Sequence, residues 1–171
     1  MTQGAVLVTP LFVGLAAHGV CIRLGALRNL ARPISEHLFG ANKTYRGIVC
    51  VAAGTAIGFV LIRPGVLERV GVPRLALLGL AVGAGAMAAE LPNSLAKRCL
   101  GIAPGTQARG LRGVLFHVLD QVDLVFGAWA VLVWVAVPSW PGVAGSLVVV
   151  YAGHQVLSLA GYWLGMRATA R

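Results

Sequence analysis

Two carboxylates three residues apart, Asp120 and Asp123, stand inside an otherwise apolar stretch of the sequence. On a helix, residues at this spacing lie on one face. If the stretch crosses a membrane, each unpaired charge costs at least about 2.5–3.5 kcal/mol near the centre, and like charges raise the cost further. A divalent metal or nearby Lys and Arg side chains must offset them. Hard oxygen ligands one turn apart suit Mg²⁺; the alternative is a structural ion pair.

A basic segment lies just ahead of the second apolar stretch. Residues 39–47 are Phe-Gly-Ala-Asn-Lys-Thr-Tyr-Arg-Gly, so two glycines bracket Lys43, Thr44 and Arg46 before an expected helix. Backbone amides at a helix start favour an anion, and the two cations strengthen that field. The spacing is not that of a P-loop. The segment is therefore interpreted as an anion-binding loop or, alternatively, as an ordinary basic membrane loop with a helix cap.

A third polar segment, residues 90–98, follows the third apolar stretch and is Glu-Leu-Pro-Asn-Ser-Leu-Ala-Lys-Arg. Pro92 is expected to be the first residue of a new helix, where proline is favoured, and Gly101 and Pro104 are expected to end that helix. The polar residues expected to share one face are Glu90, Ser94, Lys97 and Arg98. The alternative is a basic amphipathic turn at the lipid surface.

The composition indicates that lipid is the solvent of most of this chain. Of its 171 residues, 58% are hydrophobic and 11% are charged, whereas soluble domains have about 45–50% apolar and about 25% charged residues. The length suits one domain, residues 1–171. The net charge is +9, but the basic residues sit in loops between apolar runs. That pattern is typical of membrane topology and argues against nucleic acid as a partner.

Five apolar segments are expected to span the membrane, which predicts an all-α, polytopic bundle. They cover residues 5–22, 47–62, 75–89, 113–137 and 143–166, and the second and third are short for a span. Eleven of the 14 Lys and Arg residues lie in the first and third connections and the C-terminal tail. The positive-inside rule places these parts, and hence the polar site, on the cytoplasmic side of the cytoplasmic membrane. The N-terminus is then expected outside.

Smaller features add to this picture. Gly79, Gly83 and Gly85 are expected to let helices approach closely. His18 and His154 are expected to make helix–helix hydrogen bonds. His117, three residues before Asp120, is expected either to hydrogen-bond the carboxylates or to act as an acid or base. Basic phosphate-binding groups, a Mg²⁺-type carboxylate pair and a membrane location together indicate an enzyme that joins a soluble phosphate compound to a lipid phosphate.

The three polar segments resemble the motifs of CDP-archaeol synthases. Residues 38–47 resemble their G-x-x-K-T-[WY]-R-G loop, residues 94–101 (Ser-Leu-Ala-Lys-Arg-Cys-Leu-Gly) their S-F-x-K-R-R-x-G segment, and residues 119–123 (Leu-Asp-Gln-Val-Asp) their L-D-Q-[LI]-D. The order S-x-x-K-R and then D-x-x-D also marks the wider CTP:phosphatidate cytidylyltransferases. The likeness runs from about Leu15 to the end of the chain. Several positions depart from it: Ala89-Glu90 replaces Gly-Asp, Pro92 and Asn93 are unusual in the second segment, and Ser35 replaces an Asp.

The resemblance implies that CTP and a lipid phosphate react to give a CDP-lipid and pyrophosphate, with Mg²⁺ as cofactor. It implies Asp120 and Asp123 as metal ligands, with Glu90 as a third. Lys43, Arg46, Lys97 and Arg98 would hold phosphates, the last two as catalytic residues beside the aspartates. The residues implied to contact nucleotide or substrate are Asn42, Thr44, Ser94 and Gln121, with Gly40, Gly47 and Gly105 allowing close backbone approach.

Two other classes of membrane protein are alternatives to a CTP-dependent enzyme of this kind. A CDP-alcohol phosphotransferase needs a D-G-x-x-A-R motif and a second pair of Asp, and the sequence has neither. A non-enzymatic membrane protein, such as a small transporter or an assembly partner, remains the alternative, because intramembrane acids would then line a pathway. Ether-linked isoprenoid and ester-linked acyl lipids are both compatible with the pattern, and the oligomeric state is left open.

Overall fold

The computed structural model describes residues 3–104, 106, 110–163 and 165, and this part of the chain is all-α. The helices are α1 (Gln3–Val8), α2 (Pro10–Arg23), α3 (Glu36–Phe39), α4 (Tyr45–Ile62), α5 (Val72–Cys99), α6 (Gly110–Leu132) and α7 (Trp140–Trp163). Two short 3₁₀ turns, η1 (Arg28–Leu30) and η2 (Gly65–Leu67), lie in the connections.

Within the described residues, five helical segments are long and apolar enough to cross a membrane, which confirms the predicted number of spans. The first, Gln3–Arg23, combines α1 and α2. The break falls at Thr9, where Pro10 begins α2 and the Thr9 hydroxyl donates to the Val6 carbonyl at 2.7 Å. Proline suits a helix start because its missing N–H would have had no partner there.

The third and fourth spans differ from the sequence expectation. The third was expected to be short, with a new helix beginning at Pro92, but α5 runs unbroken through Pro92 for 28 residues. An internal proline removes one backbone hydrogen bond and normally disfavours a helix. Membrane helices tolerate it, because neighbouring groups can satisfy the freed backbone. The fourth helix ends at Leu132, five residues before the expected Val137.

Glycines let α5 lie very close to the helices on both sides, as the sequence predicted. A Cβ built on Gly79 would lie 2.5 Å from the Cα of Ala56 in α4, and one on Gly83 would lie 2.7 Å from the Cα of Ala52. On the other side, a Cβ on Gly85 would lie 2.8 Å from a backbone oxygen of α6. Backbones at such distances admit no side chain, so α5 is held between α4 and α6.

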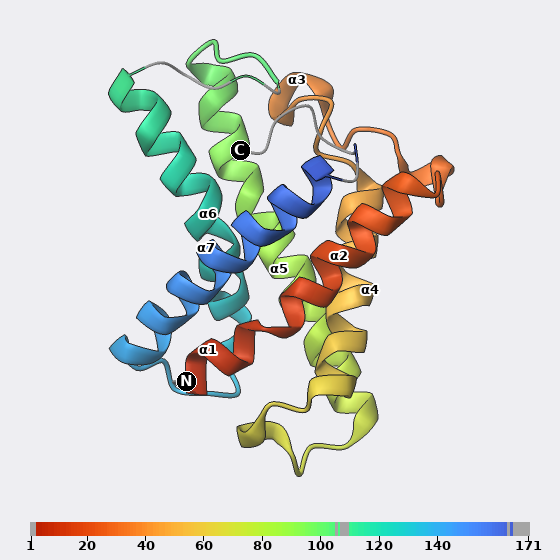
Figure 1. The fold of residues 1–171 in the computed structure, drawn as a ribbon, viewed down its shortest axis with the longest axis vertical. Coiled ribbons are helices and arrows are strands. Elements are labelled where there is room, and N and C mark those ends of the chain that lie inside the picture. Colours follow the sequence, from red (N-terminus) through yellow and green to blue (C-terminus); the bar gives the residue numbers. More distant parts are fainter. Residues whose placement is uncertain (1–2, 105, 107–109, 164, 166–171) are drawn as a thin grey trace.

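The polar connections gather at one end of the bundle. Figure 1 shows α3, the end of α5, the start of α6 and the C-terminal end of α7 at that end, while the N-terminus lies at the other. Apolar side chains from several spans, among them Phe59, Leu75, Val82 and Leu124, form the core between the two ends. The fold therefore places residues from distant parts of the sequence around one polar end.

The close contact of α4 and α5 gives a stability prediction. Gly83→Ala should lower the free energy of unfolding by about 1–3 kcal/mol, because overpacking forces the two helices apart. Thermal unfolding in detergent measures the effect. Gly65→Ala is the control, because Gly65 lies inside the η2 turn and its Cβ would meet only Glu68 Oε1 at 3.8 Å. Equal effects of the two substitutions would contradict the packing interpretation.

Candidate active site

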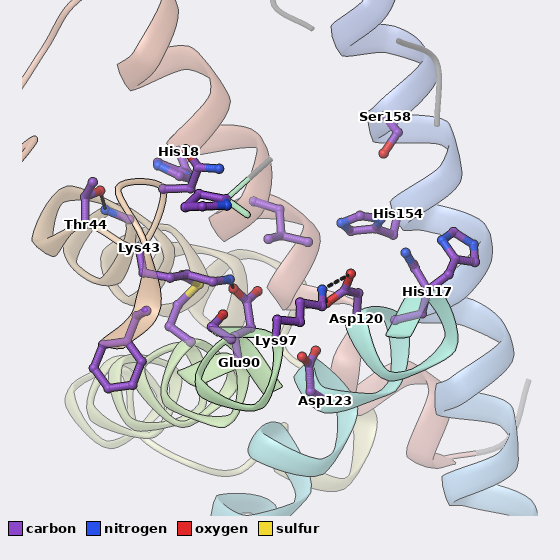
Figure 2. Close-up of a pocket in the computed structure, with 18 of the residues that line it drawn as sticks. His18, Lys43, Thr44, Glu90, Lys97, His117, Asp120, Asp123, His154 and Ser158 are labelled. Atoms are coloured by element: carbon purple, nitrogen blue, oxygen red, sulfur yellow. Dashed lines mark hydrogen bonds and ion pairs between the residues drawn. The ribbon is translucent and has the colours of Figure 1, made fainter. Parts of the chain in front are cut away.

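A polar cavity of about 410 Å³ lies at this end of the bundle, within the usual size of ligand sites. Figure 2 shows side chains of α2, the loop before α4, α5, α6 and α7 around it. The three polar segments of the sequence meet here. The predicted site residues that line the cavity are Asn42, Lys43, Thr44, Gly47, Glu90, Ser94, Lys97, Arg98, Asp120, Gln121 and Asp123.

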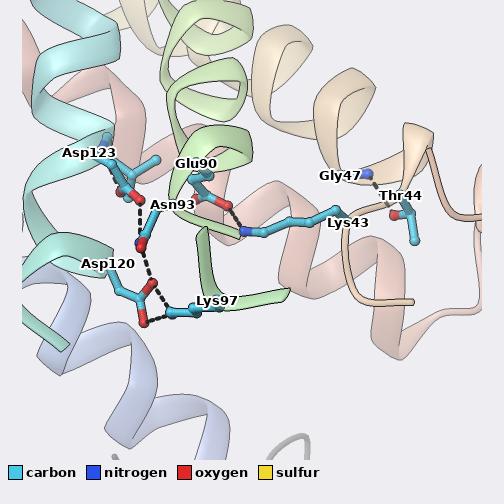
Figure 3. Close-up of polar contacts among 9 residues, drawn as sticks. Lys43, Thr44, Gly47, Glu90, Asn93, Lys97, Asp120 and Asp123 are labelled. Atoms are coloured by element: carbon cyan, nitrogen blue, oxygen red, sulfur yellow. Dashed lines mark hydrogen bonds and ion pairs between the residues drawn. The ribbon is translucent and has the colours of Figure 1, made fainter. Parts of the chain in front are cut away.

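The segment from residue 34 to the start of α4 is shaped by local hydrogen bonds, two of them side-chain caps. Ser35 caps α3, with its hydroxyl oxygen accepting from the Leu38 N–H at 3.3 Å. Thr44 caps α4 in the same way, accepting from the Gly47 N–H at 3.2 Å. The Ile34 N–H donates to the Lys43 carbonyl at 2.8 Å. These bonds fix the loop, so that the Lys43 side chain reaches toward α5 (Figure 3).

Two lysines neutralise the carboxylates of neighbouring elements. Lys43 forms an ion pair with Glu90 of α5, and both side chains are largely buried, 24% and 17% exposed. The Lys97 Nζ of α5 lies 2.5 and 2.6 Å from the two carboxylate oxygens of Asp120 in α6. Ion pairs of this kind compensate the cost of placing charge among apolar helices only when their geometry is good. Lys97 therefore supplies at least part of the positive charge that compensates the Asp120 carboxylate.

Asp120 and Asp123 lie on one face of α6, as predicted, and share a hydrogen-bond donor. The Asn93 amide nitrogen donates to Asp120 at 2.7 Å and to Asp123 at 3.2 Å (Figure 3). The second oxygen of Asp123 accepts from the Leu124 N–H at 2.8 Å. Two carboxylates that converge on one point form a donor set that suits a hard divalent cation.

Glu90 is directed elsewhere. It pairs with Lys43, and among the described residues no three His, Cys, Asp or Glu side chains come close enough to form a metal-binding group. The structure thus brings together the two predicted aspartate ligands but leaves the predicted third ligand beside a lysine. The assignment of Mg²⁺ to these residues stays a prediction.

Two other predicted site residues that the structure describes, Gly40 and Arg46, do not line the cavity. Gly40 instead shapes the turn: its φ is +85°, a conformation that favours glycine, and a Cβ there would lie 3.0 Å from Pro104. Arg46 is partly buried beyond the cavity wall, and its Nε has no hydrogen-bond partner in the described part of the chain. Gly105 lies outside the described residues.

Helix α7 contributes residues that the sequence interpretation missed. His154, Gln155 and Ser158 line the cavity, and His18 of α2 and His117 of α6 join them (Figure 2). The sequence interpretation assigned His18 and His154 to helix–helix contacts. The signal was present in α7 as polar residues at i, i+1 and i+4, but it was weak within a long apolar segment.

Together, a membrane-spanning bundle and a cavity lined by lysines, carboxylates and imidazoles define a membrane-embedded enzyme that acts on a charged group. A family model described as CDP-archaeol synthase, CarS-like, matches residues 16–170. The chain therefore belongs to the CDP-archaeol synthase family. The enzyme class that the motifs implied, a CTP-dependent lipid cytidylyltransferase, is confirmed.

Curated relatives support the same assignment. The chain is 32% identical over 140 residues to the CDP-archaeol synthase of Methanoregula boonei, covering 77% of this chain and 80% of that one. It is 35% identical over 137 residues to the enzyme of that name from Methanopyrus kandleri, covering 77% and 70%, and 32% identical over 139 residues to that from Aeropyrum pernix, covering 79% and 71%. No solved structure matches the chain significantly.

The Lys43–Glu90 pair can be tested by a double-mutant cycle. Lys43→Met should lower the free energy of unfolding by about 1–3 kcal/mol, because it leaves a largely buried carboxylate without its partner. Combining it with Glu90→Met should recover most of that loss, since both charges are then removed. Thermal unfolding of the wild type, the single variants and the double variant measures the coupling. Additive losses would contradict a paired interaction.

Proposed function

We propose that this protein transfers a cytidylyl group from CTP to a lipid phosphate of the archaetidic or phosphatidic acid type, releasing pyrophosphate and a CDP-lipid. The observation that carries the proposal is the polar cavity, in which phosphate-binding lysines and a carboxylate pair lie beside apolar helices. Family membership supports the same reaction.

The cations of the cavity would hold the phosphates of CTP. Lys43, Lys97 and Arg98 line the cavity from two different elements, and guanidinium groups bind phosphate with two parallel hydrogen bonds. The Nε and one terminal nitrogen of Arg98 are buried and have no hydrogen-bond partner among the described residues. Such donors would gain partners when a phosphate binds. Asn42, Ser94 and Gln121 supply further polar groups for the phosphates or the base.

The reaction is a displacement at phosphorus. An oxygen of the lipid phosphate attacks the α-phosphorus of CTP, the bond to the β,γ-diphosphate breaks, and the pyrophosphate leaves with the bonding electrons. Positioning and charge stabilisation do most of the work in such transfers. Lys97 and Arg98 would stabilise the negative charge that accumulates on the leaving group. Mg²⁺, held by Asp120 and Asp123, would supply further positive charge, and Glu90 is the other candidate ligand.

A second, more apolar cavity supports a lipid as the acceptor. It measures about 330 Å³, lies between α2 and α7, and shares Leu15, His18, His154 and Ser158 with the polar cavity. Its remaining lining is mainly aliphatic and glycine, and Arg23 lies among those residues. A lipid phosphate would place its hydrocarbon chain in this cavity and its headgroup at the shared wall.

We further propose that the site faces the cytoplasm across the cytoplasmic membrane. The polar end of the bundle includes the first and third connections and the C-terminal end of α7 (Figure 1). With the C-terminal tail these regions carry eleven of the 14 Lys and Arg residues, and such an excess favours the cytoplasmic side. CTP would then reach the cavity from the compartment in which nucleotides are made.

The carboxylate pair gives the central test. Asp120→Asn and Asp123→Asn should each lower CDP-lipid formation by at least about 100-fold, because the neutral amide cannot hold the cation that offsets phosphate charge. Purified protein, labelled CTP, Mg²⁺ and a panel of lipid phosphates are combined, and the CDP-lipid is detected by mass. Unchanged helix content, measured by circular dichroism, shows that the bundle is intact. Full activity of the Asn variants would exclude the metal assignment.

The apolar cavity gives a separate test. Ala160→Trp should raise the KM for the lipid phosphate several-fold and leave the KM for CTP unchanged, because Ala160 lines only this cavity. The control is Ala53→Trp, an exposed position on α4 that lines neither cavity. Equal KM values for the two variants would argue against this path for the lipid chain.

A further inference from the structure

Asn93 occupies the point at which the two aspartates converge. It lies on α5 one turn after Glu90 and one turn before Lys97, and its single amide nitrogen donates to both Asp120 and Asp123. The other end of the amide, Oδ1, is buried and has no hydrogen-bond partner among the described residues. A buried acceptor without a partner is unfavourable, so the side chain is held in place by its contacts with the carboxylates.

The orientation of this amide depends on the charge beside it. Without a metal ion, the N–H end faces the two aspartates, beside the Lys97 Nζ that pairs with Asp120, because an amide oxygen there would be repelled by the carboxylates. With a divalent cation between the carboxylates, an N–H end would be repelled instead, and the oxygen end becomes the favourable one. Rotation about the last side-chain bond exchanges the two ends while the rest of the side chain stays in place.

The spacing of the three side chains suits such an exchange. Mg²⁺ binds oxygens at 2.0–2.1 Å in an octahedron, so neighbouring ligand oxygens lie about 2.9 Å apart. The Asn93 amide nitrogen lies 2.7 Å from an oxygen of Asp120 and 3.2 Å from one of Asp123. An oxygen in the place of that nitrogen would therefore be close to ligand spacing on both sides. Glu90 pairs with Lys43 and shares no hydrogen-bond partner with the aspartates among the described residues, whereas Asn93 contacts both of them.

We propose that Asn93 is the third protein ligand of the divalent cation at Asp120 and Asp123, and that it takes this role by reversing its amide. Without the cation, the same side chain holds the two carboxylates together through its N–H group. This inference rests on the proposed cation site and replaces Glu90 by Asn93 as the third ligand. It also gives α5 a direct part in cation binding.

The test measures cation binding without turnover. Mn²⁺, which accepts the same oxygen ligands as Mg²⁺, is titrated into the purified wild type and variants in detergent without CTP, and free Mn²⁺ is followed by electron paramagnetic resonance. Asn93→Leu should weaken Mn²⁺ binding by about 10- to 100-fold. Glu90→Gln should weaken it less than Asn93→Leu does, because that side chain is not a ligand in this proposal.

Asn93→Asp separates a ligand from a structural donor. It keeps an oxygen but loses the N–H, so it should bind Mn²⁺ at least as tightly as the wild type. Its melting temperature without cation should fall, since three carboxylates then meet, and Mn²⁺ should raise it again. Undiminished Mn²⁺ affinity in Asn93→Leu, or a greater loss in Glu90→Gln, would overturn the assignment of Asn93.

Asp120→Asn distinguishes failure of this inference from failure of the proposed cation site. If Asp120→Asn abolishes Mn²⁺ binding and Asn93→Leu does not, the cation site stands and only the role of Asn93 is wrong. If the wild type binds no Mn²⁺, both are wrong. If Asn93→Leu does not fold, Asn93→Asp still decides, because weak binding in that variant contradicts an oxygen ligand.

Discussion

Charged side chains in a membrane-embedded bundle need opposite charges, and here the partners come from different elements. Lys43, from the loop before α4, pairs with Glu90 of α5, and Lys97 of α5 pairs with Asp120 of α6. Because an unpaired charge among apolar helices is costly, these pairs favour one arrangement of the loop, α5 and α6. The positions of the other cavity residues depend on that arrangement.

Helix α5 contributes both the closest helix–helix contacts and several polar side chains of the cavity. Its glycines bring its own backbone into contact with α4 on one side and with α6 on the other, in the apolar half of the helix. Beyond them, Glu90, Asn93 and Lys97 face the neighbouring elements as a polar network. Close packing leaves little freedom for the helices to shift, so the network is held at a constant geometry. A continuous helix through Pro92 is what connects the two halves.

Much of this arrangement could be predicted from the sequence, and the misses have physical causes. The number of spans follows from hydropathy, which is a local property of the chain. The cluster of Lys43, Lys97 and Asp120 follows from their being polar residues at the borders of apolar segments. The contribution of α7 to the cavity was not predicted, because its few polar residues are spread along an apolar helix. The prediction that a new helix begins at Pro92 was wrong, because the preference of proline for a helix start was outweighed by the packing of the surrounding bundle.

The sequence by itself determined that this is a five-span membrane protein with basic and carboxylate groups at the ends of its helices. It also indicated the family, because the three motifs are short and continuous along the chain. Only the tertiary structure decided which cation neutralises which carboxylate, that Asn93 bridges the two aspartates, and that α2 and α7 complete the cavity. These are contacts between elements distant in sequence. They depend on which helices are neighbours and how closely they pack, and no local pattern of residues encodes that.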